Sequence, residues 1–157
     1  MQTDGTNLDT ARQLMGELEA GGPPGERSRR IAAWNGPAQI KAGLALANGD
    51  WELAHRLAQG MTCPVGAHWH ALVHRHEGDF PNSRYWLRLA GDSPIYPLLA
   101  QAAQEEGVAE LVAPGGRWDP DLFTGYFAGG GGQPWVKTLD ALEIRSLLAQ
   151  QVAVFAG

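Results

Sequence analysis

The sequence Gly-Asp-aromatic occurs twice, each time between segments whose apolar residues have helical spacing. Residues 49–51 (Gly-Asp-Trp) and 78–80 (Gly-Asp-Phe) stand 29 residues apart. Glycine tolerates the left-handed backbone that ends a helix, and aspartate is a favoured cap for the helix that follows. We therefore predict two helical hairpins of tetratricopeptide-like character, with Gly78 in a left-handed conformation and Asp79 as a helix cap.

The remaining sequence predicts further helices around these hairpins and no sheet. Apolar residues recur at helical spacing near both ends of the chain, and no segment alternates with the period of two expected of a strand. A chain of 157 residues is about one domain long. We predict an all-α helical bundle over residues 1–157, with a polar N-terminus at 1–7, a Gly/Pro linker at 21–25 and a glycine-rich loop at 129–132.

Composition excludes several classes of partner. The net charge of −5 is unsuited to a nucleic-acid backbone, which requires a basic surface. No apolar run approaches the roughly 20 residues that a transmembrane helix needs. The first residues are polar and acidic, unlike a signal peptide, so we expect a cytoplasmic protein with no membrane partner.

Residues 70–86 contain a distinctive motif of histidine, acidic and aromatic residues. It resembles the signature His-x3-His-Arg-x-Glu-Gly-Asp-x2-Asn-x2-Tyr-Trp of an uncharacterised bacterial protein family. In this chain the motif falls on His70, His74, Arg75, Glu77, Gly78, Asp79, Asn82, Tyr85 and Trp86. The resemblance implies a helical fold and brings no activity with it.

All five histidines of the chain lie within residues 55–76. On a helix, residues four and seven positions apart point in nearly the same direction. His70, His74 and Glu77 therefore share one face, and two imidazoles with a carboxylate can bind zinc or iron. If the second hairpin closes normally, this face meets the next helix. The candidate binding cluster is His70, His74, Glu77, Asn82, Tyr85 and Trp86, with His70, His74 and Glu77 as the metal ligands.

Two interpretations of this cluster remain open. In the favoured one, the histidines form a buried hydrogen-bonded network with Glu77, Asn82 and Tyr85 and bind no metal. The protein is then a non-catalytic binding module for a protein, a peptide or a small molecule, or for a second copy of itself in a homo-oligomer. In the alternative, it is a metal-binding protein or a metal-dependent enzyme. No cofactor motif in the sequence is strong, and the cofactor stays unknown.

Overall fold

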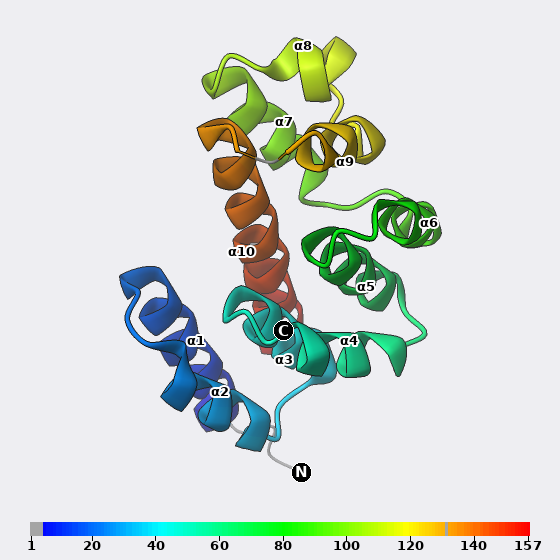
Figure 1. Ribbon diagram of the computed structural model, residues 1–157. Coiled ribbons are helices and arrows are strands. Elements are labelled where there is room, and N and C mark those ends of the chain that lie inside the picture. Colours follow the sequence, from blue (N-terminus) through cyan, green and yellow to red (C-terminus); the bar gives the residue numbers. More distant parts are fainter. Residues whose placement is uncertain (1–4, 131) are drawn as a thin grey trace.

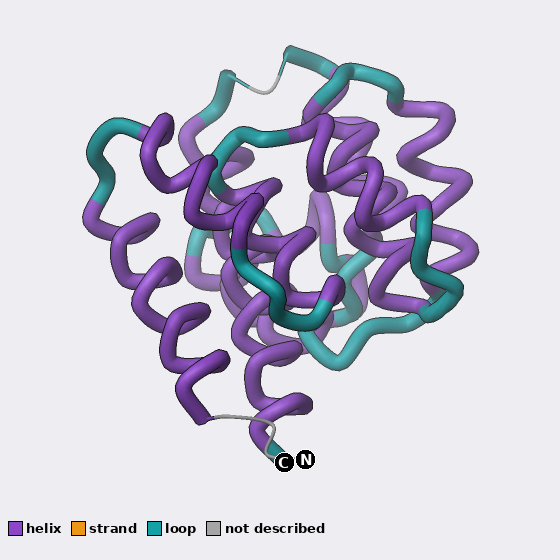
Figure 2. Tube along the Cα trace, turned by 90° about the horizontal axis from the view of Figure 1, so that it is seen from below, coloured by secondary structure: helices purple, strands orange, loops and turns teal. Residues whose placement is uncertain are grey.

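The computed structural model describes residues 5–130 and 132–157, and this part of the chain consists of helices and loops without a strand (Figure 1). The predicted all-α fold is confirmed, and the helices are joined by short loops (Figure 2). The elements are α1 Gly5–Ala20, α2 Pro24–Ala33, α3 Ala38–Ala47, α4 Trp51–Gln59, α5 Pro64–His76, α6 Phe80–Ala90, α7 Tyr96–Glu105, α8 Ala109–Val112, the 3-10 helix η1 Pro114–Gly116, α9 Pro120–Ala128 and α10 Pro134–Ala156.

Some boundaries differ from those the sequence predicts. Helix α1 begins at Gly5, inside the segment 1–7 expected to be a polar terminus. Helix α2 begins at Pro24, so the connection before it is 21–23 rather than 21–25, because proline suits the first turn of a helix. In the predicted glycine-rich loop, residues 129, 130 and 132 are not helical, while Gly131, like residues 1–4, lies outside the described residues.

The two predicted hairpins are present, and their turns have the same backbone. Gly49 and Gly78 have φ angles of 82° and 80°, which confirms the left-handed conformation expected at Gly78. In both turns the amide of the following aspartate donates a hydrogen bond of 2.8 Å to a carbonyl five residues earlier. Asp79 accepts a bond from the Asn82 amide and caps α6, whereas Asp50 makes no side-chain capping bond. The two hairpins therefore share the backbone conformation of their turns. That the hairpins are tetratricopeptide-like stays a prediction.

Helix α10 runs through the molecule and contacts elements from both ends of the chain (Figure 1). Its start packs near α7 and α9, and its later turns pack on α3 and α1. Helices α3, α4, α5 and α6 pack in succession beside it, each on the next. Although α10 has 23 residues, none of the helices in the described ranges is both long and apolar enough to cross a membrane.

Trp69 on α5 lies at the centre of the core. Its side chain is fully buried, and its Nε1 donates a hydrogen bond of 2.8 Å to the carbonyl of Gln39. The indole ring occupies the space beside Gly43 on α3, where an added Cβ would lie 2.5 Å from Trp69 Cζ2 and 2.9 Å from Leu148 Cδ1. Helix α3 can therefore approach α5 and α10 this closely only because residue 43 has no side chain.

This close packing predicts a measurable loss of stability when Gly43 is replaced by alanine. The added methyl group forces Trp69 or Leu148 to move, so we expect Gly43→Ala to lower the free energy of unfolding by about 1–3 kcal/mol. The matched control is Gly16→Ala on the exposed face of α1, where no atom lies within 4 Å of an added Cβ. That control should be neutral or stabilising by up to about 1 kcal/mol. Equal urea midpoints for the two variants would contradict the packing.

Candidate metal centre

Helix α5 carries polar side chains on two different sides. It begins at Pro64, ends before the Gly78 turn, and buries ten of its 13 residues because α3, α4 and α6 pack around it. His70 and His74, one turn apart, face α4 and α6, where their ring contacts lie. Arg75 extends in another direction and reaches α10. The first side forms the candidate metal centre, and the second forms a buried ion cluster.

Three histidines meet where α4 packs on α5. One ligand nitrogen from each of His55, His70 and His74 lies within 4.8 Å of the other two. The Nε2 atoms of His55 and His70 are 2.9 Å apart, so the N–H of one ring donates a hydrogen bond to the other ring. A tetrahedral zinc ion with Zn–N bonds of 2.0–2.1 Å holds its ligand nitrogens about 3.3 Å apart. Small ring movements would therefore let all three nitrogens bind one ion in place of the shared proton.

Two carboxylates lie close to the Nδ1 atom of His74. Its Nδ1 is 3.4 Å from Glu77 Oε2 and 3.7 Å from Asp79 Oδ2. The Nδ1 atom of His74 is buried, and among the described residues it makes no hydrogen bond. The two carboxylates are therefore its nearest polar neighbours. A carboxylate beside one ring nitrogen keeps the proton on that nitrogen and leaves the other nitrogen for a metal. His74 is thus oriented to offer Nε2 as its ligand atom.

His70 is held in one orientation and one charge state. Its ring stacks on Trp86 of α6, with centroids 4.0 Å apart and planes inclined by 16°, and lies nearly parallel to His74 at 4.8 Å. Burial, followed by the neighbouring charges of His74 and His55, lowers the pKa of His70 to about 4. At neutral pH the His70 ring is therefore uncharged, which is the form that binds a metal ion.

The lowered pKa predicts how the metal-free protein responds to acid. Between the usual histidine value of 6.5 and the folded value of about 4, the unfolded chain binds a proton at His70 that the folded chain does not. Stability therefore rises with pH across this window and falls on acidification. We expect the free energy of unfolding, measured after chelator treatment, to depend less on pH in His70→Gln than in the parent protein. Parallel pH profiles for the two proteins would contradict this assignment.

The ligand set differs from the one the sequence indicates. His70 and His74 lie side by side as predicted. Glu77, the predicted third ligand, lies 3.4 Å from Nδ1 of His74 and is not one of the three residues whose ligand atoms converge. The third member of the cluster is His55 on α4, which helical periodicity within α5 cannot indicate.

The other predicted site residues lie on α6 and do not join a network with the histidines. Asn82 donates its side-chain hydrogen bond of 2.7 Å to Asp79. Tyr85 is 48% exposed and sets its ring edge-on to Trp86. Within the described residues neither Asn82 nor Tyr85 hydrogen-bonds to His70 or His74, so the predicted buried network is reduced to the contact between His74 and Glu77.

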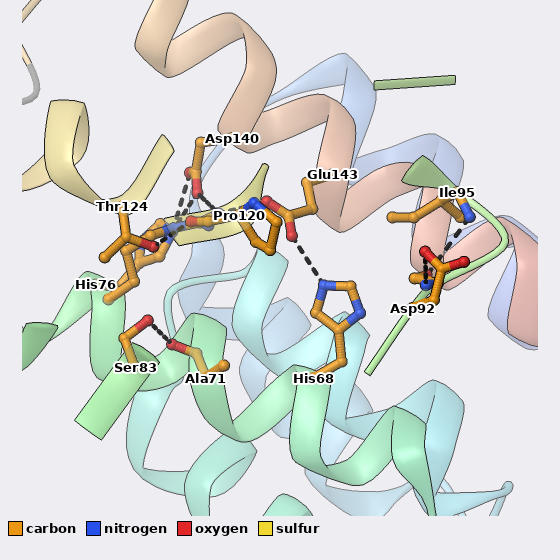
Figure 3. A network of polar contacts seen from close by, with 12 residues as sticks. His68, Ala71, His76, Ser83, Asp92, Ile95, Pro120, Thr124, Asp140 and Glu143 are labelled. Carbon is orange, nitrogen blue, oxygen red and sulfur yellow. Dashed lines mark hydrogen bonds and ion pairs between the residues drawn. The ribbon is translucent and has the colours of Figure 1, made fainter. Parts of the chain in front are cut away.

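The other side of α5 contributes to a buried ion cluster that the sequence gives no sign of. Arg75 Nη2 donates to Asp140 Oδ1 at 2.6 Å and to Glu143 Oε1 at 2.9 Å, both on α10. His68 Nε2 lies 2.8 Å from Glu143, and His76 Nε2 lies 2.9 Å from Asp140. Figure 3 shows His68 and His76 reaching these two carboxylates from α5. Together the five side chains join α5 to α10.

Arg75, Asp140 and Glu143 are held in their charged forms. Burial alone would raise the pKa of Glu143 and of Asp140, but the Arg75 charge and the hydrogen bonds outweigh it, so both pKa values are lowered. Burial likewise acts to lower the pKa of Arg75, and the two carboxylates more than reverse this. The guanidinium also lies 4.9 Å and 5.4 Å from the ring centroids of Phe123 and Phe127 on α9. This cluster fixes the helix on which two of the three clustered histidines stand.

We found no match to this chain among protein-family models, curated proteins or solved structures. The resemblance to a bacterial family therefore stays a prediction. Function must be inferred from the geometry of the site itself.

Proposed function

We propose that this protein binds a divalent transition-metal ion, with zinc as the best match, through His55, His70 and His74. The observation that carries the proposal is the convergence of three imidazole nitrogens within 4.8 Å, from two separate helices. Imidazole suits zinc, copper, iron and nickel, whereas magnesium and calcium prefer oxygen ligands. A tetrahedral arrangement of these donors favours zinc, because its d-electrons impose no other geometry.

Features around the histidines support the same proposal. A metal-ligating histidine usually donates its second ring N–H to a carboxylate or a carbonyl. Glu77 and Asp79 stand at this position beside His74. Trp86 fixes the plane of His70 by stacking on it, and so fixes the direction of its lone pair. The three rings are therefore preoriented before any ion arrives, which lowers the entropic cost of binding.

The proposal is compatible with a non-catalytic binding module built from tetratricopeptide-like hairpins. The first hairpin supplies His55 on α4, and the second supplies His70 and His74 on α5. The metal ion would then tie the two hairpins together. Binding of a peptide, a protein or a second copy of the chain is a separate prediction, and no contact described above bears on it.

The test is a metal-binding titration of protein produced without an affinity tag. After removal of bound metal with a chelator, the protein is titrated with Zn²⁺, desalted, and measured for metal content by mass spectrometry. We expect one zinc ion per chain in the parent protein and none in a variant that carries His55→Ala, His70→Ala and His74→Ala.

The matched control is His76→Gln, which removes a histidine from the same helix. His76 contacts Asp140 on α10 and lies outside the three-histidine group. This variant should keep one zinc ion per chain. A parent protein that retains no zinc, or a triple variant that retains as much as the parent, would overturn the proposed function.

A further inference from the structure

The proposed site offers three protein ligands, which is one fewer than a closed metal site requires. A structural zinc site uses four protein ligands, whereas a site with three keeps its fourth position for water or an exogenous molecule. Among the described residues the group that could share one ion contains His55, His70 and His74, with no cysteine and no carboxylate. The count of donors therefore leaves one position of a tetrahedral ion without a protein ligand.

The two nearby carboxylates contact His74 and do not belong to the group whose ligand atoms converge. Glu77 Oε2 and Asp79 Oδ2 both approach Nδ1 of His74, and the ion would sit at Nε2, on the other side of the ring. Asp79 is in addition held by Asn82, whose side chain donates to it at 2.7 Å and whose backbone amide completes the cap of α6. Moving Asp79 onto the ion would therefore break the helix cap.

The site also lies near solvent. The side chains of Glu77 and Asp79 are 35% and 42% exposed, and His55 is partly exposed on α4. A small solute can thus reach this edge of the molecule. Trp86 covers a face of His70 by stacking on it, and His70 and His74 are only 4% and 9% exposed, so only a small ligand fits beside the ion.

We propose that the fourth coordination position takes water or a small, singly charged, monodentate anion. This inference rests on the proposed metal site and adds the chemical class of its exchangeable ligand. The positive ion attracts an anion, while the carboxylates of Glu77 and Asp79 behind His74 offset part of that charge. A multiply charged anion such as phosphate is attracted more strongly by the ion, but it is also repelled more strongly by these carboxylates and costs more to desolvate, so the extra charge brings no net gain.

The experiment uses the full-length protein loaded with Co²⁺, whose visible absorption reports the coordination shell. Azide and inorganic phosphate are titrated separately into the parent protein and into His76→Gln. We expect azide to change the absorption bands saturably in both proteins, and phosphate at equal concentration to leave them unchanged.

The outcomes separate the two proposals. If Co²⁺ binds one to one and azide does not alter its spectrum, the open position is wrong while the metal site stands. If phosphate alters the spectrum as strongly as azide does, the preference for singly charged ligands is wrong. If Co²⁺ does not bind, both the metal site and the open position fail.

Discussion

Replacing Arg75 with methionine is expected to lower the free energy of unfolding by about 3–5 kcal/mol. The side chain of Arg75 is completely buried, and its removal leaves the carboxylates of Glu143 and Asp140 in the core without their cation. Methionine keeps much of the volume, so the loss reports the unpaired charge rather than a cavity. Urea unfolding of the parent protein and the variant at neutral pH measures this loss.

Two further variants show whether the effect comes from burial. Arg84 forms an ion pair of 2.9 Å with Asp121 in which the carboxylate side chain is 67% exposed, so Arg84→Met should cost no more than about 1 kcal/mol. A triple variant, Arg75→Met with Asp140→Leu and Glu143→Met, removes the unpaired charges and should be more stable than Arg75→Met alone. Equal losses for Arg75→Met and Arg84→Met would show that the buried ion cluster does not stabilise the fold.

The buried ion cluster cannot be predicted from local sequence patterns. Helical periodicity and turn chemistry are local, so the helices on either side of Gly78 and the cap at Asp79 follow from neighbouring residues. His68 and Glu143 are 75 residues apart, and Arg75 and Asp140 are 65 apart. An acidic residue on the amphipathic pattern of α10 is normally assigned to the solvent face. Only the packing of α10 against α5 shows that two of its carboxylates are buried.

The sequence predicts only part of the candidate site, because helical periodicity is local and the packing of one helix on another is not. His70 and His74 belong to one helix, so their shared face follows from the helical repeat. His55 belongs to the preceding helix, and its approach depends on how α4 packs against α5. A signal for it did exist, because His55 and His70 lie at comparable distances from the loop that joins the two helices, and antiparallel neighbours bring such residues side by side. Helical periodicity within α5 alone selects Glu77 instead of His55.

The two possible ligand sets predict opposite rankings of metal affinity. If His55, His70 and His74 bind the ion, His55→Ala removes a direct ligand and should weaken zinc binding more than 100-fold. Glu77→Gln then removes only a carboxylate that orients His74, and the usual effect of such a change is a weakening of about 10–100-fold. Competition with a chromophoric chelator at neutral pH measures both affinities.

The ranking decides between the sequence-derived ligands and the ligands that the fold brings together. If Glu77→Gln abolishes zinc binding while His55→Ala retains it, the set His70, His74 and Glu77 is correct and the three-histidine site is wrong. Melting curves of the metal-free variants control for unfolding, because a misfolded His55→Ala protein would also lose zinc. Saturating zinc should raise the melting temperature of the parent protein by mass action, and should leave that of His55→Ala almost unchanged.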